Sequence, residues 1–183
     1  MGPLQTELNR VAGLTSKDQL PELLAHYQSI NVTAFFNFGD WWTPEDAKQF
    51  QEKAGCEVKE YDNFVAVDEV RVHGALTIGE NIADNGGMRL AFLALVEDAT
   101  RKNINLNRNQ DGRTPLQQFF LAYAQGKCGS SRPEQLRVQA QSDRHSPEKF
   151  RVNGVVQNMP EFWVAFGCKT GQPMMPANAC RVW

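Results

Sequence analysis

The sequence predicts a mainly α-helical protein with a few short extended segments. Apolar side chains recur at spacings of three and four along most of the chain, as they do on the buried face of an amphipathic helix. Several of these stretches begin with a Ser or Thr that can cap the first turn, sometimes with Pro beside it. Alternation of apolar and polar residues, which favours strands, occurs only in short stretches.

The N-terminal residues 3–30 are predicted to form two helices. The first ends at Gly13, and Ser16 and Gln19 have the spacing of a capping box that opens the second. The aromatic residues 34–38 then predict a short strand.

The next helix is predicted to begin at Thr43 and Pro44, because Thr is a good N-cap and Pro fits the first helical position. We expect this helix to end near Cys56. Residues 61–75 alternate and predict a hairpin or an extended segment, and a long helix is expected over 77–101.

The C-terminal half is predicted to contain further short helices, separated by polar loops and prolines. In order, we expect a loop at 102–114, a helix over 116–127 capped by Thr114, a helix from about 131, a short helix ending at 150–151, a last helix over 160–166, and an irregular tail at 171–183.

The composition fits a soluble globular protein, with 42% hydrophobic and 22% charged residues and a net charge of −2. This charge balance gives no reason to expect a nucleic-acid partner. No run approaches the roughly 18 apolar residues that a membrane span needs, and residues 1–5 predict no signal peptide in the chain as given.

The four cysteines are widely spaced and form no Cys-x-x-Cys pair. This spacing favours disulfides over a zinc knuckle, and four cysteines allow three pairings. The alternative is that they are buried free thiols of a protein from a reducing compartment.

Residues 79–87 carry the strongest functional signal in the chain. Glu80 and Asp84 are four residues apart in a predicted helix, so both carboxylates project from one face. This pattern, followed by Gly86 and Gly87, is typical of a metal ligand and the acid that supports it. The alternative is that both are ordinary exposed acids of a helix surface.

The histidines of a zinc protease are missing from this pattern. The chain contains His26, His73 and His145, and none of them lies in a His-Glu-x-x-His sequence, which would provide two zinc ligands and a general base. The sequence therefore predicts part of a catalytic centre.

Seven landmarks resemble the C-terminal part of the M13 zinc metallopeptidases, the neprilysin and endothelin-converting enzyme family with its bacterial PepO relatives. They follow the family's order at residues 41–45, 79–87, 118–124, 132–134, 145–147, 150–154 and 180–183. The resemblance implies the helical C-terminal half of a zincin-type peptidase domain over 40–183. Residues 1–38 more loosely resemble a helical segment from the start of the family's ectodomain.

The resemblance implies a role for each candidate site residue. Glu80 would be the third protein ligand of zinc, and Asp84 would orient a histidine ligand. His145 would stabilise the oxyanion that forms on the peptide carbonyl. Arg151 would pair with Asp84 and donate to the substrate's backbone carbonyl.

The same resemblance implies a disulfide between Cys56 and Cys180. Cys128 and Cys168 would lack their partners, because those cysteines belong to the start of the family's ectodomain. It also implies an extracytoplasmic location, in the periplasm, at the cell surface or in the secreted state.

Two main functions follow from these expectations. The chain could be part of a peptide-cleaving metalloendopeptidase, active only when a complementing chain supplies the His-Glu-x-x-His segment. It could instead be a non-catalytic remnant that binds a peptide or a partner. A third possibility is a truncated chain with no function of its own.

Overall fold

The computed structural model describes residues 43–182. The helices predicted over 3–30, the strand at 34–38 and the boundary near residue 40 lie outside this part. The described part contains six helices and two short strands: α4 Pro44–Asp62, β1 Val65–Val67, β2 Val70–Arg71, α5 Gly74–Arg101, α6 Pro115–Gly126, α7 Pro133–Ser142, α8 Glu148–Val156 and α9 Pro160–Phe166. The mainly α-helical fold is confirmed.

Helix α4 begins at Pro44, as predicted, but it extends to Asp62, so the end expected near Cys56 is wrong. Its buried residues Ala54, Glu57 and Tyr61 follow the spacing of one helix face. The helix continues because these side chains pack against the rest of the molecule and no helix-breaking residue follows Cys56 before Asn63.

The predicted hairpin is confirmed as an antiparallel pair of β1 and β2, with Val65 opposite Arg71. Helix α5 begins at Gly74, three residues before the predicted start at Thr77. Gly74 lies so close to α4 that a Cβ atom there would be 2.2 Å from the Val58 carbonyl oxygen. The glycine is therefore needed for close packing of α4 and α5.

The later helices follow their sequence signals with one exception. Thr114 and Gln117 form a capping box at the start of α6, and α9 has the predicted bounds. Helix α8 continues to Val156, past the end expected near Arg151. Its last two residues, Val155 and Val156, are buried in the main core, and this burial favours the longer helix.

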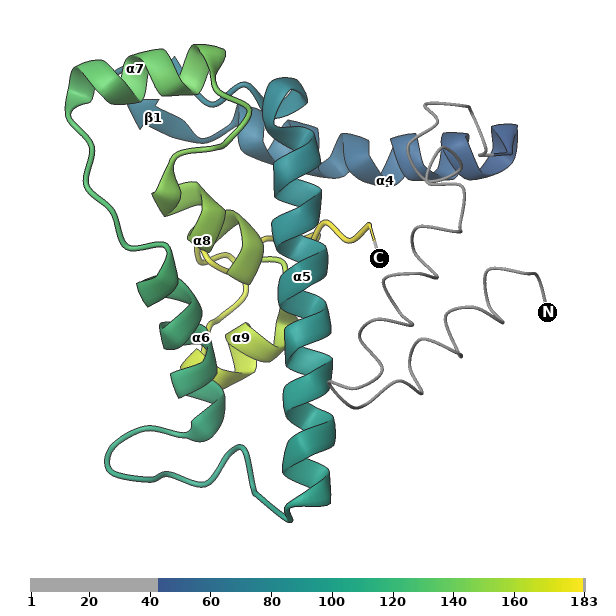
Figure 1. Cartoon of the computed structure of the whole chain (residues 1–183), viewed down its shortest axis with the longest axis vertical. Coiled ribbons are helices and arrows are strands. Elements are labelled where there is room, and N and C mark those ends of the chain that lie inside the picture. The colour runs from purple at the N-terminus through teal and green to yellow at the C-terminus, as the bar shows by residue number, and fades with distance from the viewer. Residues whose placement is uncertain (1–42, 183) are drawn as a thin grey trace, which may run out of the picture. The chain divides into compact units, whose positions relative to one another are not determined.

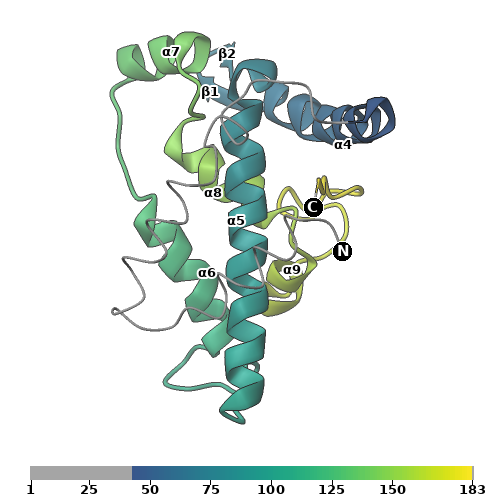
Figure 2. The same cartoon turned by 45° about the vertical axis from the view of Figure 1, so that its right-hand side comes forward.

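Helix α5 runs along the described part, with α6, α8 and α9 beside it and α4 crossing near its N-terminal end (Figures 1 and 2). The largest core lies between these helices and is formed by Met88, Phe92, Leu116, Phe120, Val155, Val156 and Met159.

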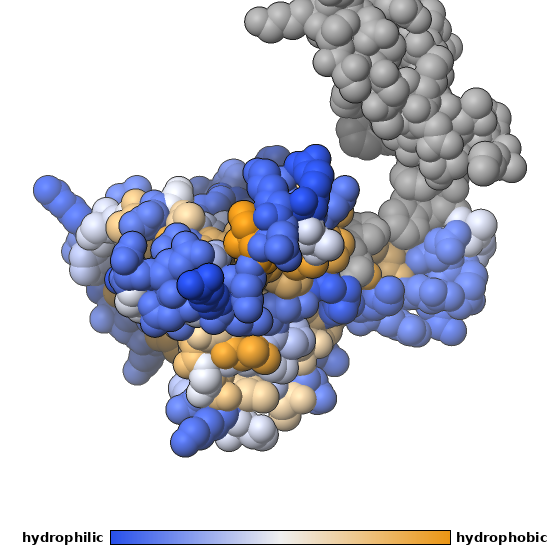
Figure 3. Space-filling view, turned by 90° about the horizontal axis from the view of Figure 1, so that it is seen from below, coloured by the Kyte–Doolittle hydropathy of each residue, from blue (hydrophilic) through white to orange (hydrophobic). Residues whose placement is uncertain are grey.

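Seen from below, the surface is mainly hydrophilic, with small hydrophobic patches (Figure 3). Leu90 and Leu93 on α5 are among the exposed apolar side chains. Within residues 43–182, no helix is long and apolar enough to cross a membrane.

Candidate functional site

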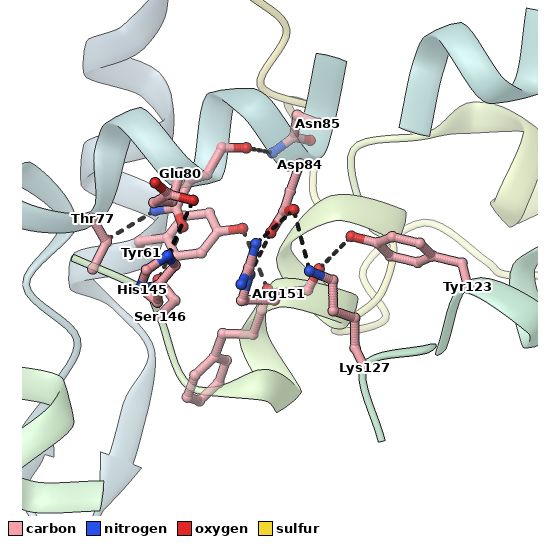
Figure 4. A network of polar contacts seen from close by, with 12 residues as sticks. Tyr61, Thr77, Glu80, Asp84, Asn85, Tyr123, Lys127, His145, Ser146 and Arg151 are labelled. Carbon is pink, nitrogen blue, oxygen red and sulfur yellow. Dashed lines mark hydrogen bonds and ion pairs between the residues drawn. The ribbon is translucent and has the colours of Figure 1, made fainter. Parts of the chain in front are cut away.

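Helix α5 presents Glu80 and Asp84 on one face, toward α8 and the loop that precedes it (Figure 4). Their spacing of four residues places the two carboxylates on the same helix face, as the sequence predicted. Their surroundings differ, because the side chain of Glu80 is 37% exposed and that of Asp84 only 13%. Glu80 can therefore meet a group from outside, whereas Asp84 needs a partner within the protein.

That partner is Arg151 on α8. The Arg151 Nε donates to Asp84 Oδ2 at 2.6 Å, and Nη2 donates to Oδ1 at 2.9 Å. Both N–H groups of one edge of the guanidinium thus meet one carboxylate, the strongest geometry for this kind of pair. The hydrogen bonds to Asp84 raise the pKa of Arg151 further above its ordinary value. The structure brings together two residues that the sequence places 67 positions apart.

His145 lies in the loop before α8 and faces Glu80. Its Nε2 is 3.3 Å from Glu80 Oε2, and its Nδ1 is 3.0 Å from Asp143 Oδ1. The His145 backbone N–H also donates to Asp143, and this hydrogen bond is the main reason why the pKa of Asp143 is lowered. The imidazole is thus held between two carboxylates and is still 43% exposed.

A buried chain of polar residues fixes the loop of His145 against α5. Ser146 donates from its hydroxyl to Asn81 Oδ1 at 2.9 Å, and Asn81 Nδ2 donates to the Thr77 hydroxyl at 2.9 Å. All three residues are almost fully buried. The only sign of this hydrogen-bonded chain in the sequence is the spacing of four between Thr77 and Asn81, which places both on one helix face.

The end of α6 contributes two further groups that no sequence motif indicated. The Tyr123 hydroxyl donates to the backbone carbonyl of Arg151 at 2.8 Å. The Lys127 ammonium lies 3.5 Å from Asp84 Oδ1. Burial raises the pKa of Tyr123, so its phenol remains a donor at all physiological pH values. Helices α5, α6 and α8 therefore meet at the Asp84 carboxylate (Figure 4).

Two acids of α4 have raised pKa values: Glu57, which is fully buried, and Glu60, which is partly buried. Burial, with a smaller effect of the nearby Glu60, raises the pKa of Glu57 to about 8. Burial likewise raises the pKa of Glu60 to about 7. Asn85 donates to Glu57 Oε2 at 3.4 Å, whereas Glu57 Oε1 is buried without a hydrogen-bond partner among the described residues. Nothing in the sequence pattern marked Glu57 as buried.

The disulfide implied by the family resemblance is present. Cys56 on α4 is bonded to Cys180 in the tail, with their Cα atoms 5.5 Å apart. Cys128 and Cys168 are free thiols. The bond fixes the C-terminal tail to α4, next to the small core cluster of Ala54, Ile82 and Val182.

The described residues do not form a complete zinc site. No group of three or more His, Cys, Asp or Glu side chains within 43–182 is arranged to hold a metal ion. Glu80 and His145 provide at most two donors, whereas a catalytic zinc has three protein ligands. Asp84 is paired with Arg151 and does not form a three-donor group with them.

Comparison with known families and curated proteins gives concordant matches. Residues 24–182 match the sequence pattern of peptidase family M13. The chain is 42% identical over 156 residues to membrane metallo-endopeptidase-like 1 of Mus musculus, a match that covers 80% of this chain and 20% of that protein. It is 38% identical over 147 residues to the endothelin-converting enzyme homolog of Locusta migratoria, with the same coverage. The chain thus spans about one fifth of the length of these relatives.

Solved structures agree with these sequence matches. The zinc metalloprotease ZMP1 of Mycobacterium tuberculosis, solved in complex with an inhibitor, matches with a TM-score of 0.68 and 35% identity, over 79% of this chain and 22% of that one. PepO from Lactobacillus rhamnosis matches with a TM-score of 0.60 and 34% identity, over 74% and 19% of the two chains. The helical arrangement described above is therefore shared with part of these larger enzymes.

Proposed function

This chain belongs to peptidase family M13, and we propose that its residues 40–183 act as the C-terminal portion of a zinc-dependent metalloendopeptidase domain. The observation that carries the proposal is the convergence of Glu80, Asp84, His145 and Arg151 at one partly exposed site. These residues come from two helices and a loop. A cluster of ionisable side chains from separate elements, paired at one partly exposed place, is typical of a functional site.

Each side chain has a role that fits its position. Glu80 is exposed enough to serve as one ligand of a zinc ion that a larger assembly holds. Asp84 would orient a histidine of the missing His-Glu-x-x-His segment, with Arg151 keeping the carboxylate in place. Arg151 uses Nε and Nη2 for Asp84, so Nη1 points away from this pair and can donate to a substrate carbonyl.

His145 would donate to the same carbonyl oxygen as negative charge develops on it. The contact of its Nδ1 with Asp143 and the buried Ser146 orient the ring, so Nε2, on the side of Glu80, is the nitrogen that would donate to the substrate. A donor that is oriented before the reaction contributes more than one that has to be reoriented. The described residues provide no general base, so this chain alone is not expected to hydrolyse peptides.

The proposal is tested by complementation. The purified chain is mixed with a fragment of an M13 relative that carries the His-Glu-x-x-His segment and ends before the position of Thr43. We expect peptide hydrolysis by the mixture only, inhibition by a chelator, and loss of activity with Glu80→Gln. Glu134→Gln, a conservative change of an exposed acid on α7, is the matched control and should retain activity. A mixture that binds zinc but is unaffected by Glu80→Gln would contradict the role of Glu80.

A second function is supported by the incomplete metal site. The described residues lack a set of three ligands, yet the Asp84–Arg151 pair and the anchored His145 loop are intact. The chain could therefore bind peptides without cleaving them. Zinc analysis of the purified chain separates the two functions, since stoichiometric zinc that disappears in Glu80→Ala would contradict a purely non-catalytic module.

We also propose an oxidising, extracytoplasmic location. The Cys56–Cys180 disulfide is the kind of bond that persists outside reducing compartments. One relative is named a membrane metallo-endopeptidase-like protein, which agrees with such a location. Mapping of this disulfide in protein taken from its native source tests the assignment, and a reduced pair would contradict it.

A further inference from the structure

Lys127 gives the Asp84 carboxylate a second positive partner. Lys127 caps the C-terminal end of α6, and its ammonium lies 3.5 Å from Asp84 Oδ1. Arg151 already holds both oxygens of the same carboxylate at 2.6 and 2.9 Å. Two cations thus face one carboxylate, and they do so at very different distances.

The two cations are not equivalent. Arg151 is bidentate and only 15% exposed, so moving it would leave the largely buried Asp84 without its main partner. Lys127 is 25% exposed and lies at the outer limit of a hydrogen bond. Its ammonium has three donors on a flexible stem. Lys127 can therefore turn toward an incoming anion while Asp84 remains paired with Arg151.

The other polar groups around Lys127 are engaged. The Tyr123 hydroxyl donates to the Arg151 carbonyl at 2.8 Å, and Arg151 is held by Asp84. Asp84 is the only carboxylate with a contact to Lys127 that is apparent in the described part of the chain. An anion that approaches from solvent thus meets a lysine whose present contact is weak.

We propose that Lys127 is a specificity-determining residue that binds a carboxylate of a peptide ligand next to Arg151. The inference rests on the proposed function, because it takes peptides as the ligands of this site. The carboxylate can be an acidic side chain or the C-terminus of the peptide, since both present the same two oxygens to an ammonium group. The class of ligand is thus an acidic peptide, or a peptide with a free C-terminus at this position.

Binding of three peptides to the full chain tests the proposal. The first peptide is neutral and amidated, the second replaces one Gln by Glu, and the third is the neutral peptide with a free C-terminus. Titration calorimetry should show that the second or the third binds about fivefold more tightly than the first, the gain expected for one partly exposed ion pair. Which of the two gains affinity identifies the source of the carboxylate.

Two variants assign the preference to Lys127. Lys127→Met keeps most of the stem but removes the charge and should abolish the preference, whereas Lys127→Arg should keep it. Thermal unfolding and disulfide mapping show whether the Met variant is folded. If it is not, the salt dependence of the wild-type preference still decides, because an ion pair weakens as salt rises.

Equal binding of the three peptides, absence of binding to all of them, or a preference that Lys127→Met retains would overturn the inference. These results are distinct from failure of the proposed function, which is measured as hydrolysis by the complemented chain. A mixture that cleaves all peptides equally well would support the peptidase and refute only the role of Lys127.

Discussion

We predict that this protein loses stability as the pH rises, because the acid Glu57 is buried. Its side chain is fully buried on α4, and burial raises its pKa from an ordinary 4.5 to about 8. The folded state therefore holds a proton that the unfolded chain releases at lower pH. The stabilising effect of this proton is fully present below the unfolded pKa and is lost as the pH rises through the folded pKa.

The expected loss of unfolding free energy follows from the raised pKa of Glu57. One pKa unit corresponds to 1.36 kcal/mol, so the change from 4.5 to about 8 corresponds to a loss of about 5 kcal/mol as an upper bound. The loss amounts to about 1.4 kcal/mol per pH unit between pH 5 and 7.5. Glu60, whose pKa is raised to about 7, adds to the slope below neutral pH.

Glu57→Gln isolates the contribution of this group. Glutamine has the same shape and is never charged, so the variant should match the wild type near pH 5 and be more stable by a few kcal/mol at pH 8.5, following the same shift. The measurement is denaturant unfolding followed by circular dichroism at several pH values between 5 and 8.5, with the disulfide intact. Glu52→Gln, the same change at an exposed position of α4, is the matched control.

Either of two results would contradict a raised pKa of Glu57 in the folded protein. The wild-type free energy of unfolding could stay constant or rise between pH 5.5 and 8.5. Alternatively, Glu57→Gln could lose stability with pH as steeply as Glu52→Gln does.

Three further predictions each remove a single contact, and in each case the free energy of unfolding is measured. Arg151→Met should destabilise by about 2–3 kcal/mol, because it leaves Asp84 with only its weaker cation, and a loss below about 0.5 would show that the pair is solvated. Removing the Cys56–Cys180 bond by Cys180→Ser should cost about 4–5 kcal/mol in the chain-entropy model, given its separation of 124 residues, and unchanged stability would contradict this account. Thr114→Ala should cost about 1 kcal/mol by removing the α6 cap, whereas Thr114→Ser should be nearly neutral.

Local features of the site could be predicted from the sequence, because they depend on neighbours along the chain. The spacing of Glu80 and Asp84 placed both acids on one helix face. Thr114 and the following proline marked the start of α6, which the structure confirms. The disulfide followed from resemblance to a family, since spacing alone allowed three pairings.

The sequence by itself thus determined the mainly helical fold, most helix starts and the pair of acids on α5, since these follow from the spacing of backbone hydrogen bonds and side chains within a few residues. The pairing of Arg151 with Asp84 was implied by the family resemblance, and the structure shows its bidentate geometry. Only the tertiary structure decided that Lys127 lies beside this pair and that Glu57 is buried. It also extended α4 and α8 beyond their expected ends. The physical reason is that burial and ion pairing arise between segments far apart in the chain, where packing of side chains determines which groups meet.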